Sequence, residues 1–188
     1  MSKDQFYLIA LGANLPSAEG APDVTLRSAL RRLSEAGARE VVASRFFATP
    51  CFPAGAGPDY VNAAARLEFE GGAEALLALL HRIEAEFGRE RVQRWGQRVL
   101  DLDLIAAGDR VLPDEAGYRA WLDLPLEEQK QQAPDRLILP HPRMQDRPFV
   151  LVPLAEVAPE WRHPVLGRTV RQMVDDLPRA ARDEVEPL

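Results

Sequence analysis

Cysteine, lysine and long apolar runs are scarce in this sequence, and each scarcity excludes a class of protein. Among 188 residues there is one cysteine, Cys51, so an internal disulfide framework and a cysteine-ligated metal site are both excluded. We therefore expect the chain to work in the reducing cytoplasm. No apolar run approaches the ~18 residues that a membrane-spanning helix needs, and the apolar run before Gly12 is too short for a secretory signal. The sequence predicts no membrane or export role.

Lysine occurs only at Lys3 and Lys130, so almost all positive charge is carried by arginine. The formal net charge is −6, which gives no overall field that would attract nucleic acid. The phosphate-binding loop G-x-x-x-x-G-K-[ST] is absent, because the glycine turn at residues 12–15 does not match it and neither lysine is near. A nucleotide-binding enzyme with this sequence must therefore hold phosphates with arginine and metal.

Hydrophobic residues make up 46% and charged residues 28%, which is typical of a globular protein and fits one domain over residues 1–188. Alternating and helical periodicities predict the order β-α-β-β-α-β with a C-terminal extension. That order favours the α+β class, with a ferredoxin-like antiparallel sheet core and helices on one face. The expected strands are 6–11, 41–47, 60–69, 99–105 and 110–112. The expected helices are 23–36, capped by Asp23, 76–87, about 118–132, and 170–177, capped by Thr169. Residues 113–135 are expected to be an insertion.

Two aspartates stand in the alternating run Leu100-Asp101-Leu102-Asp103-Leu104. Side chains alternate across a strand, so the leucines enter the core while both carboxylates share the opposite face. Aspartate is a poor strand former and like charges on one face repel, so an offsetting partner is expected. A pair of Mg²⁺ ions would supply it, since hard oxygen ligands suit that ion. The alternatives are a solvated strand face, or arginine partners only.

A dense group of arginines precedes this strand within ten residues. Its members are Arg89, Arg91, Arg94 and Arg98. Guanidinium groups bind phosphate oxygens in pairs and stay charged, which suits a polyphosphate beside bound metal. In an arginine-rich chain the alternative is a solvated surface. The acidic strand that follows directly favours metal-assisted phosphoryl chemistry.

Five segments, taken together, resemble the 6-hydroxymethyl-7,8-dihydropterin pyrophosphokinase family of folate biosynthesis. They are LGANLP (11–16), FFATP (46–50), DYVNAAARLE (59–68), HRIEAEFGRERVQRWGQRVLDLDL (81–104) and LILPHPRMQDRPFVLVPLAEVAPE (137–160). The segments follow the family order and cover most of the chain. The resemblance implies that pyrophosphate passes from ATP to the 6-hydroxymethyl group of the pterin, which releases AMP. It also implies a monomer that binds these two small molecules.

The resemblance also implies roles for individual residues. Asp101 and Asp103 would bind two Mg²⁺ ions, and Arg89 and Arg98 would stabilise charge on the transferring group. The implied ATP-site residues are Glu84, Arg91, Leu104, Arg136, His141 and Arg147. The implied pterin-site residues are Thr49, Pro50, Phe52, Tyr60, Asn62, Trp95 and Phe149. Aromatic faces and an amide suit a flat heterobicycle, although aromatic residues on their own would more simply be core.

Three positions depart from the family pattern: Cys51 and Gln97 replace prolines, and Ile138 replaces a polar residue. None of them removes a carboxylate or a core arginine, so we read them as variation. Two other functions stay open at this point. One is another metal-dependent transferase that uses D-x-D, such as a glycosyltransferase, although G-x-G-x-x-G is absent. The other is a relative that binds pterin or nucleotide without turnover.

Overall fold

A sheet of six antiparallel strands forms the centre of the fold, in the order β5-β1-β4-β3-β6, with β2 also paired to β4. The structure is a computed structural model, and it describes residues 6–51, 57–88, 99–125, 127–128, 132 and 134–188. The strands are β1 (Phe6–Ala13), β2 (Arg39–Ala43), β3 (Phe47–Thr49), β4 (Tyr60–Glu68), β5 (Asp101–Ala107) and β6 (Glu186–Pro187). The helices are α1 (Pro22–Glu35), α2 (Ala73–Glu86), α3 (Glu115–Leu122), the short 3-10 helix η1 (Met144–Asp146), α5 (Pro148–Val157), α6 (Val170–Asp176) and α7 (Arg179–Asp183). The order β1-α1-β2/β3-β4-α2-β5 confirms the predicted ferredoxin-like core.

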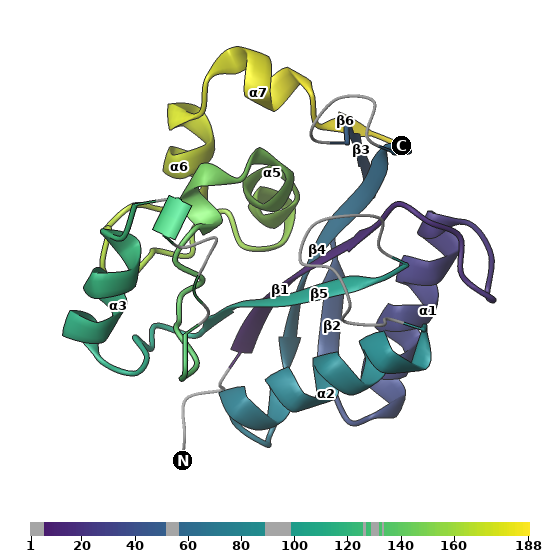
Figure 1. The fold of residues 1–188 in the computed structure, drawn as a ribbon, viewed down its shortest axis with the longest axis horizontal. Coiled ribbons are helices and arrows are strands. Elements are labelled where there is room, and N and C mark those ends of the chain that lie inside the picture. The colour runs from purple at the N-terminus through teal and green to yellow at the C-terminus, as the bar shows by residue number, and fades with distance from the viewer. Residues whose placement is uncertain (1–5, 52–56, 89–98, 126, 129–131, 133) are drawn as a thin grey trace.

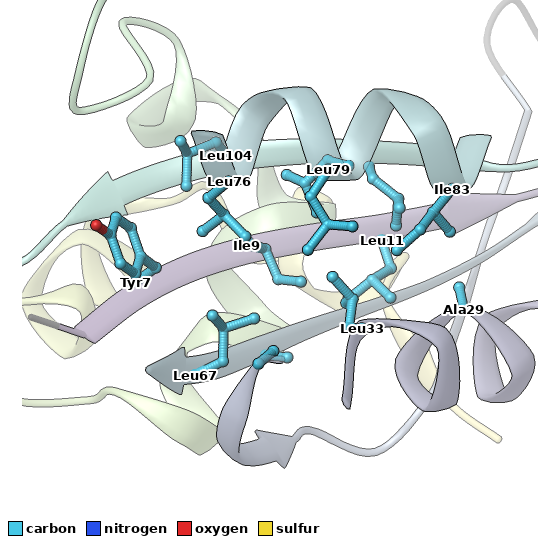
Figure 2. Packing of buried hydrophobic residues seen from close by; sticks show 14 of the residues in the cluster. Tyr7, Ile9, Leu11, Ala29, Leu33, Leu67, Leu76, Leu79, Ile83 and Leu104 are labelled. Atoms are coloured by element: carbon cyan, nitrogen blue, oxygen red, sulfur yellow. The ribbon is translucent and has the colours of Figure 1, made fainter. Parts of the chain in front are cut away.

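Helices cover both faces of the sheet (Figure 1). The odd-numbered residues of β1, such as Ile9 and Leu11, pack with leucines of α1 and α2 into one buried cluster, part of which Figure 2 shows. Leu8 and Ala10 point the other way, into a second cluster with residues of α5 and α6. Every residue from Tyr7 to Ala13 is therefore buried, which explains why this strand reads as a continuous apolar run.

The expectation of helices on one face holds for α1 and α2 only, because the C-terminal extension builds a second layer from α5 and α6. Helix α5 is not predicted from the sequence. Its residues are almost uniformly apolar, so they show no polar face, and Pro148 and Pro153 argue against a helix. Pro148 is tolerated because it stands in the first turn, where its missing N–H has no helical partner.

Several element boundaries differ from the predictions. The strand expected at 41–47 is two strands, because the Ser44 side chain accepts a hydrogen bond from the Ala64 N–H where the ladder would continue. Asp23 does not cap α1: the helix begins at Pro22 after Ala21, and Asp23 lies in the first turn. In place of strand 110–112 there is a single bridge between Leu112 and Leu139.

Helix α3 is shorter than predicted, whereas α6 agrees with its prediction. The helix expected at 118–132 is α3, which ends at Leu122. Helix α6 confirms the expected cap, because Thr169 and Gln172 form a reciprocal capping box. No helix within the described ranges is long and apolar enough to cross a bilayer.

Candidate active site

A row of polar positions crosses three strands at the end of the sheet where β1 finishes. Asp101 of β5 stands opposite Gly12 of β1, and Gly12 stands opposite Asn62 of β4. One step along, Asp103 stands opposite Ala10. Residues directly opposite one another in antiparallel strands point to the same face, so these side chains share one side of the sheet. It is the side that also carries α5, as the partners of Ala10 in the second cluster show.

The alternation along β5 is the one that the sequence predicts. Leu102 and Leu104 are buried in the cluster under α1 and α2, whereas Asp101 and Asp103 are partly exposed on the other face. Asp103 has an arginine partner: its Oδ2 atom lies 3.5 Å from Nη1 of Arg147. The guanidinium of Arg147 also lies 5.9 Å from the ring centre of Phe149. An arginine therefore offsets part of the like-charge repulsion, and the pair stays accessible to solvent.

Asn62 forms the amide end of the row and is held in place by β3. Its side chain is buried, and its Nδ2 atom donates a hydrogen bond of 2.7 Å to the Thr49 hydroxyl. Tyr60, two residues before Asn62, is paired with Thr49 across β3 and β4 and points to the same face. Three residues expected in the pterin pocket are thus brought together.

Gly12 places no side chain in the middle of the row, a role that its interpretation as part of a turn does not predict. A Cβ atom built on Gly12 would lie 3.0 Å from Oδ1 of Asn62, closer than most side chains tolerate. The amide cannot retreat easily, because its nitrogen is bonded to Thr49. The available signal was a glycine at the end of a buried apolar strand, which often marks a close approach.

His141 lies beside the acidic end of the row and is held by its backbone. Its N–H donates to the carbonyl of Ile105 in β5 at 2.8 Å, and its Nδ1 atom accepts from the Arg143 N–H at 3.1 Å. Burial, and then the charges of Arg147 and Arg143, lower the pKa of His141 to about 3. The ring is therefore neutral at physiological pH, and since Nδ1 accepts, its proton is assigned to Nε2. His141 is a neutral hydrogen-bond donor and not a cation.

Two of the expected site residues lie on the opposite face of the sheet from this row, and two more lie in loops. Glu84 is buried on α2, where its Oε1 atom accepts a 2.8 Å hydrogen bond from the Leu102 N–H, so it supports β5 from the opposite face. The Leu104 side chain lies in the core on that face. Arg136 and Pro50 are exposed in loops. Five further site expectations fall outside the described residues: Phe52, Arg89, Arg91, Trp95 and Arg98.

The site offers two carboxylates, those of Asp101 and Asp103, as ligands for a metal ion. Within the part of the chain that the structure describes, no three histidine, cysteine or acidic side chains gather closely enough to hold an ion by themselves. Asp101 and Asp103 are two carboxylates on one strand face. The site therefore lacks the ligand number of a self-sufficient metal centre, but it suits an ion whose remaining ligands come from a substrate.

Sequence comparison identifies the family to which this site belongs. Residues 8–159 match the family model of 7,8-dihydro-6-hydroxymethylpterin-pyrophosphokinase (HPPK). The chain belongs to the HPPK family. The matched range includes all of the polar row and every site residue expected from the sequence. HPPK enzymes are pyrophosphokinases that act on the hydroxymethylpterin, as the family name states.

Individual relatives agree with this HPPK assignment. A 2-amino-4-hydroxy-6-hydroxymethyldihydropteridine pyrophosphokinase of Synechocystis is 43% identical over 130 residues, which are 69% of this chain and 56% of that protein. The protein of the same name from Haemophilus influenzae is 35% identical over 171 residues, 89% of this chain and 92% of that one. The chain thus spans little more than half of the Synechocystis relative and nearly all of the Haemophilus one.

Solved structures share the fold. An HPPK-DHPS crystal structure in complex with substrates superposes with a TM-score of 0.64 at 12% identity, over 93% of this chain and 43% of that one. The wild-type HPPK-DHPS of Plasmodium falciparum gives a TM-score of 0.61 at 14% identity, over 93% and 45%. The chain spans less than half of these proteins, and at such identities the likeness shows the fold alone.

Proposed function

We propose that this chain transfers the pyrophosphoryl group of ATP to the 6-hydroxymethyl oxygen of 6-hydroxymethyl-7,8-dihydropterin, as a step of folate biosynthesis. The pterin hydroxyl oxygen bonds to the β-phosphorus and gives up its proton to solvent, the bond from that phosphorus to the bridging oxygen of AMP breaks, and AMP leaves. The polar row supports this reading together with the family match. One end carries two carboxylates, an arginine and a neutral imidazole donor, and the other end carries a fixed amide beside a tyrosine.

The acidic end fits magnesium. Asp101 and Asp103 share a strand face and are partly exposed, and Mg²⁺ is commonly held by one or two carboxylates plus the phosphates of a substrate. We propose that these two residues hold two Mg²⁺ ions. When bound, the ions would neutralise charge on the polyphosphate.

The chain's own cationic and donor groups would act on the phosphates. Arg147 already lies beside Asp103, and its guanidinium can bind phosphate oxygens in pairs. His141 would donate from Nε2 to a phosphate oxygen. By resemblance, Arg89 and Arg98 stabilise the charge that develops on the transferring group, and Arg91 adds a phosphate contact. The remaining ATP contacts expected from the resemblance are Glu84, Leu104 and Arg136, of which Glu84 and Leu104 would act through the β5 backbone that they support or belong to.

The amide end would recognise the pterin. Asn62 offers a carboxamide that can read the donor and acceptor edge of a pterin ring, and Gly12 places no side chain against the oxygen of that amide. Tyr60 and Phe149 come from different elements, so their rings can lie on different sides of a flat ligand. The other expected pterin contacts are Thr49, Pro50, Phe52 and Trp95.

The deciding experiment measures AMP formed from ATP and Mg²⁺ with and without the pterin. We expect pterin-dependent AMP in a one-to-one ratio with pyrophosphorylated pterin, and loss of AMP formation when EDTA removes the metal. Formation of ADP in place of AMP would contradict a pyrophosphoryl transfer. Binding of both ligands without AMP would favour a non-catalytic relative. A monomer in the cytoplasm is proposed as well, and sedimentation in solution would test its oligomeric state.

A further inference from the structure

The last strand of the chain lies along the outer edge of β3, as Figure 1 shows near the C-terminus. Phe47 is paired with Pro187 and Ala48 with Glu186, and the Leu188 N–H donates a 2.9 Å hydrogen bond to the carbonyl of Phe46. These residues lie well beyond residue 159, where the family match ends. Strand β6 is therefore a feature of this chain that the family assignment does not explain.

The register of β3 and β6 shows which backbone groups of β3 are hydrogen-bonded to β6. Hydrogen-bonded and non-bonded pairs alternate in antiparallel strands, and Phe46 is bonded to Leu188, so Ala48 and Glu186 form the next bonded pair. Pro187 falls at the non-bonded position, where a missing N–H costs nothing. The N–H groups of Phe47 and Thr49 then point the other way, toward β4. Hydrogen exchange of the Ala48 amide therefore measures its pairing with β6. Exchange of the Phe47 and Thr49 amides measures their pairing with β4.

Strand β3 is short and carries part of the proposed pterin site. It has three residues, and its Thr49 hydroxyl holds the Asn62 amide. Glu156 of α5 fixes the segment just before it, because its carboxylate accepts from both the backbone N–H and the Nε atom of Arg45 at 2.8 Å. Nothing comparable from the helices holds Ala48 in the described contacts, so β6 is the partner on that edge.

We propose that β6 is a positioning strand for pterin binding: it keeps β3 ordered, so that Thr49 presents the Asn62 amide in one orientation. This inference rests on the proposed function. A site that is ordered for only part of the time binds its ligand more weakly by that fraction, so loosening of β3 should weaken pterin binding. ATP binding at the acidic end, on β5 and three strands away from β3, should not change.

The test compares Glu186→Pro, which removes the N–H that donates to the Ala48 carbonyl, with Glu186→Ala, which keeps it. For the proline variant we expect the KM for pterin to rise about threefold, with kcat and the KM for ATP unchanged. This is within the range that one lost backbone hydrogen bond allows. The alanine variant should match the wild type. Amide hydrogen exchange at Ala48 should become faster in the proline variant only, while exchange at Phe47 and Thr49 stays slow.

A chain shortened by residues 185–188 provides a stronger variant, since it loses all pairing of β6 with β3, the bond from Leu188 to Phe46, and the buried Val185 side chain. We expect about a tenfold rise in the KM for pterin. An unchanged KM for pterin in the proline variant and in the shortened chain, with faster exchange at Ala48, would overturn the positioning role of β6. The proposed reaction would not be affected by that result. Absence of pterin-dependent AMP from the wild type would instead remove the proposed function, and the role of β6 with it.

Discussion

The two faces of the central sheet are built for different purposes. Toward α1 and α2 the sheet is sealed by a single large apolar cluster to which β1, β4 and β5 all contribute. Toward α5 and α6 the cluster is smaller, and it stops short of the strand ends that carry Asp101, Gly12 and Asn62. One strand serves both faces: β5 places its leucines in the sealed core and its aspartates on the open end. Stability and chemistry can therefore be changed separately by mutating neighbouring residues.

Replacement of Asp103 by alanine tests the open face and should have the largest effect. We expect pyrophosphoryl transfer to fall by at least about a thousandfold, or ~4 kcal/mol of transition-state stabilisation, because a proposed metal ligand is lost. The free energy of unfolding should change by less than about 1 kcal/mol, since the pair with Arg147 is partly exposed. Steady-state AMP formation and urea unfolding measure the two quantities.

The matched control for that variant is Asp109→Ala, at an exposed aspartate in the turn just after β5. It should keep full activity. Near-normal turnover by Asp103→Ala would show that the acid pair is a surface feature held by arginine.

Replacement of Leu76 by alanine tests the sealed face. Leu76 is fully buried between α2 and the sheet (Figure 2), so we expect a loss of about 2–5 kcal/mol in the free energy of unfolding. The kcat of the folded protein should stay the same, because the side chain points away from the polar row. Leu77, only partly buried beside it, is the control and should lose much less stability on replacement by alanine. A selective loss of kcat in Leu76→Ala would contradict the separation of the two faces.

The sequence predicts the sealed face better than the open one. Alternation along β5 is enough to place Leu102 and Asp103 on opposite faces, because the pattern is local. Helix α5 has no such local signal: its residues are apolar all round, and only a sheet face already half covered makes it a helix. The neutral state of His141 follows from burial and from Arg143 and Arg147, whose positions depend on how a separate loop packs.

The alignment of Asp101, Gly12 and Asn62 across the sheet is likewise not a local feature of the sequence. It depends on the register of three strands, and no spacing in the sequence encodes that register. The family resemblance implies that Thr49, Tyr60 and Asn62 belong to the pterin site. It does not explain why Gly12 lies between the two ends of the site.

A buried histidine in the second layer should make stability depend on pH. The Nδ1 atom of His163 accepts from the N–H groups of Val165 and Leu166, so its Nε2–H donates to the Tyr118 hydroxyl at 2.9 Å. Burial lowers the pKa of His163 from 6.5 to about 4. Between pH 6.5 and pH 4, His163 is therefore protonated in the unfolded chain but neutral in the folded chain. This stability is fully present above pH 6.5 and is lost progressively down to pH 4.

We expect this residue to account for about 2 kcal/mol of lost stability between pH 7 and pH 5. Urea unfolding at both pH values, compared with His163→Asn, isolates the contribution from that of His141 and the carboxylates. The asparagine can still accept from the loop amides and does not titrate. An equal change in both proteins would show that His163 is not the cause.

The smallest expected effect concerns a polar atom on the sealed face. Tyr7 is fully buried, burial raises the pKa of its hydroxyl, and among the described residues that hydroxyl has no hydrogen-bond partner. A buried donor without a partner lowers stability, so Tyr7→Phe should be neutral or should raise the free energy of unfolding by up to about 1 kcal/mol. Tyr118→Phe is the matched comparison, because the hydroxyl of Tyr118 is bonded to His163 and its loss should cost about 1 kcal/mol. Parallel urea titrations would decide between them, and a clear loss of stability in Tyr7→Phe would mean that a buried water completes the sealed face.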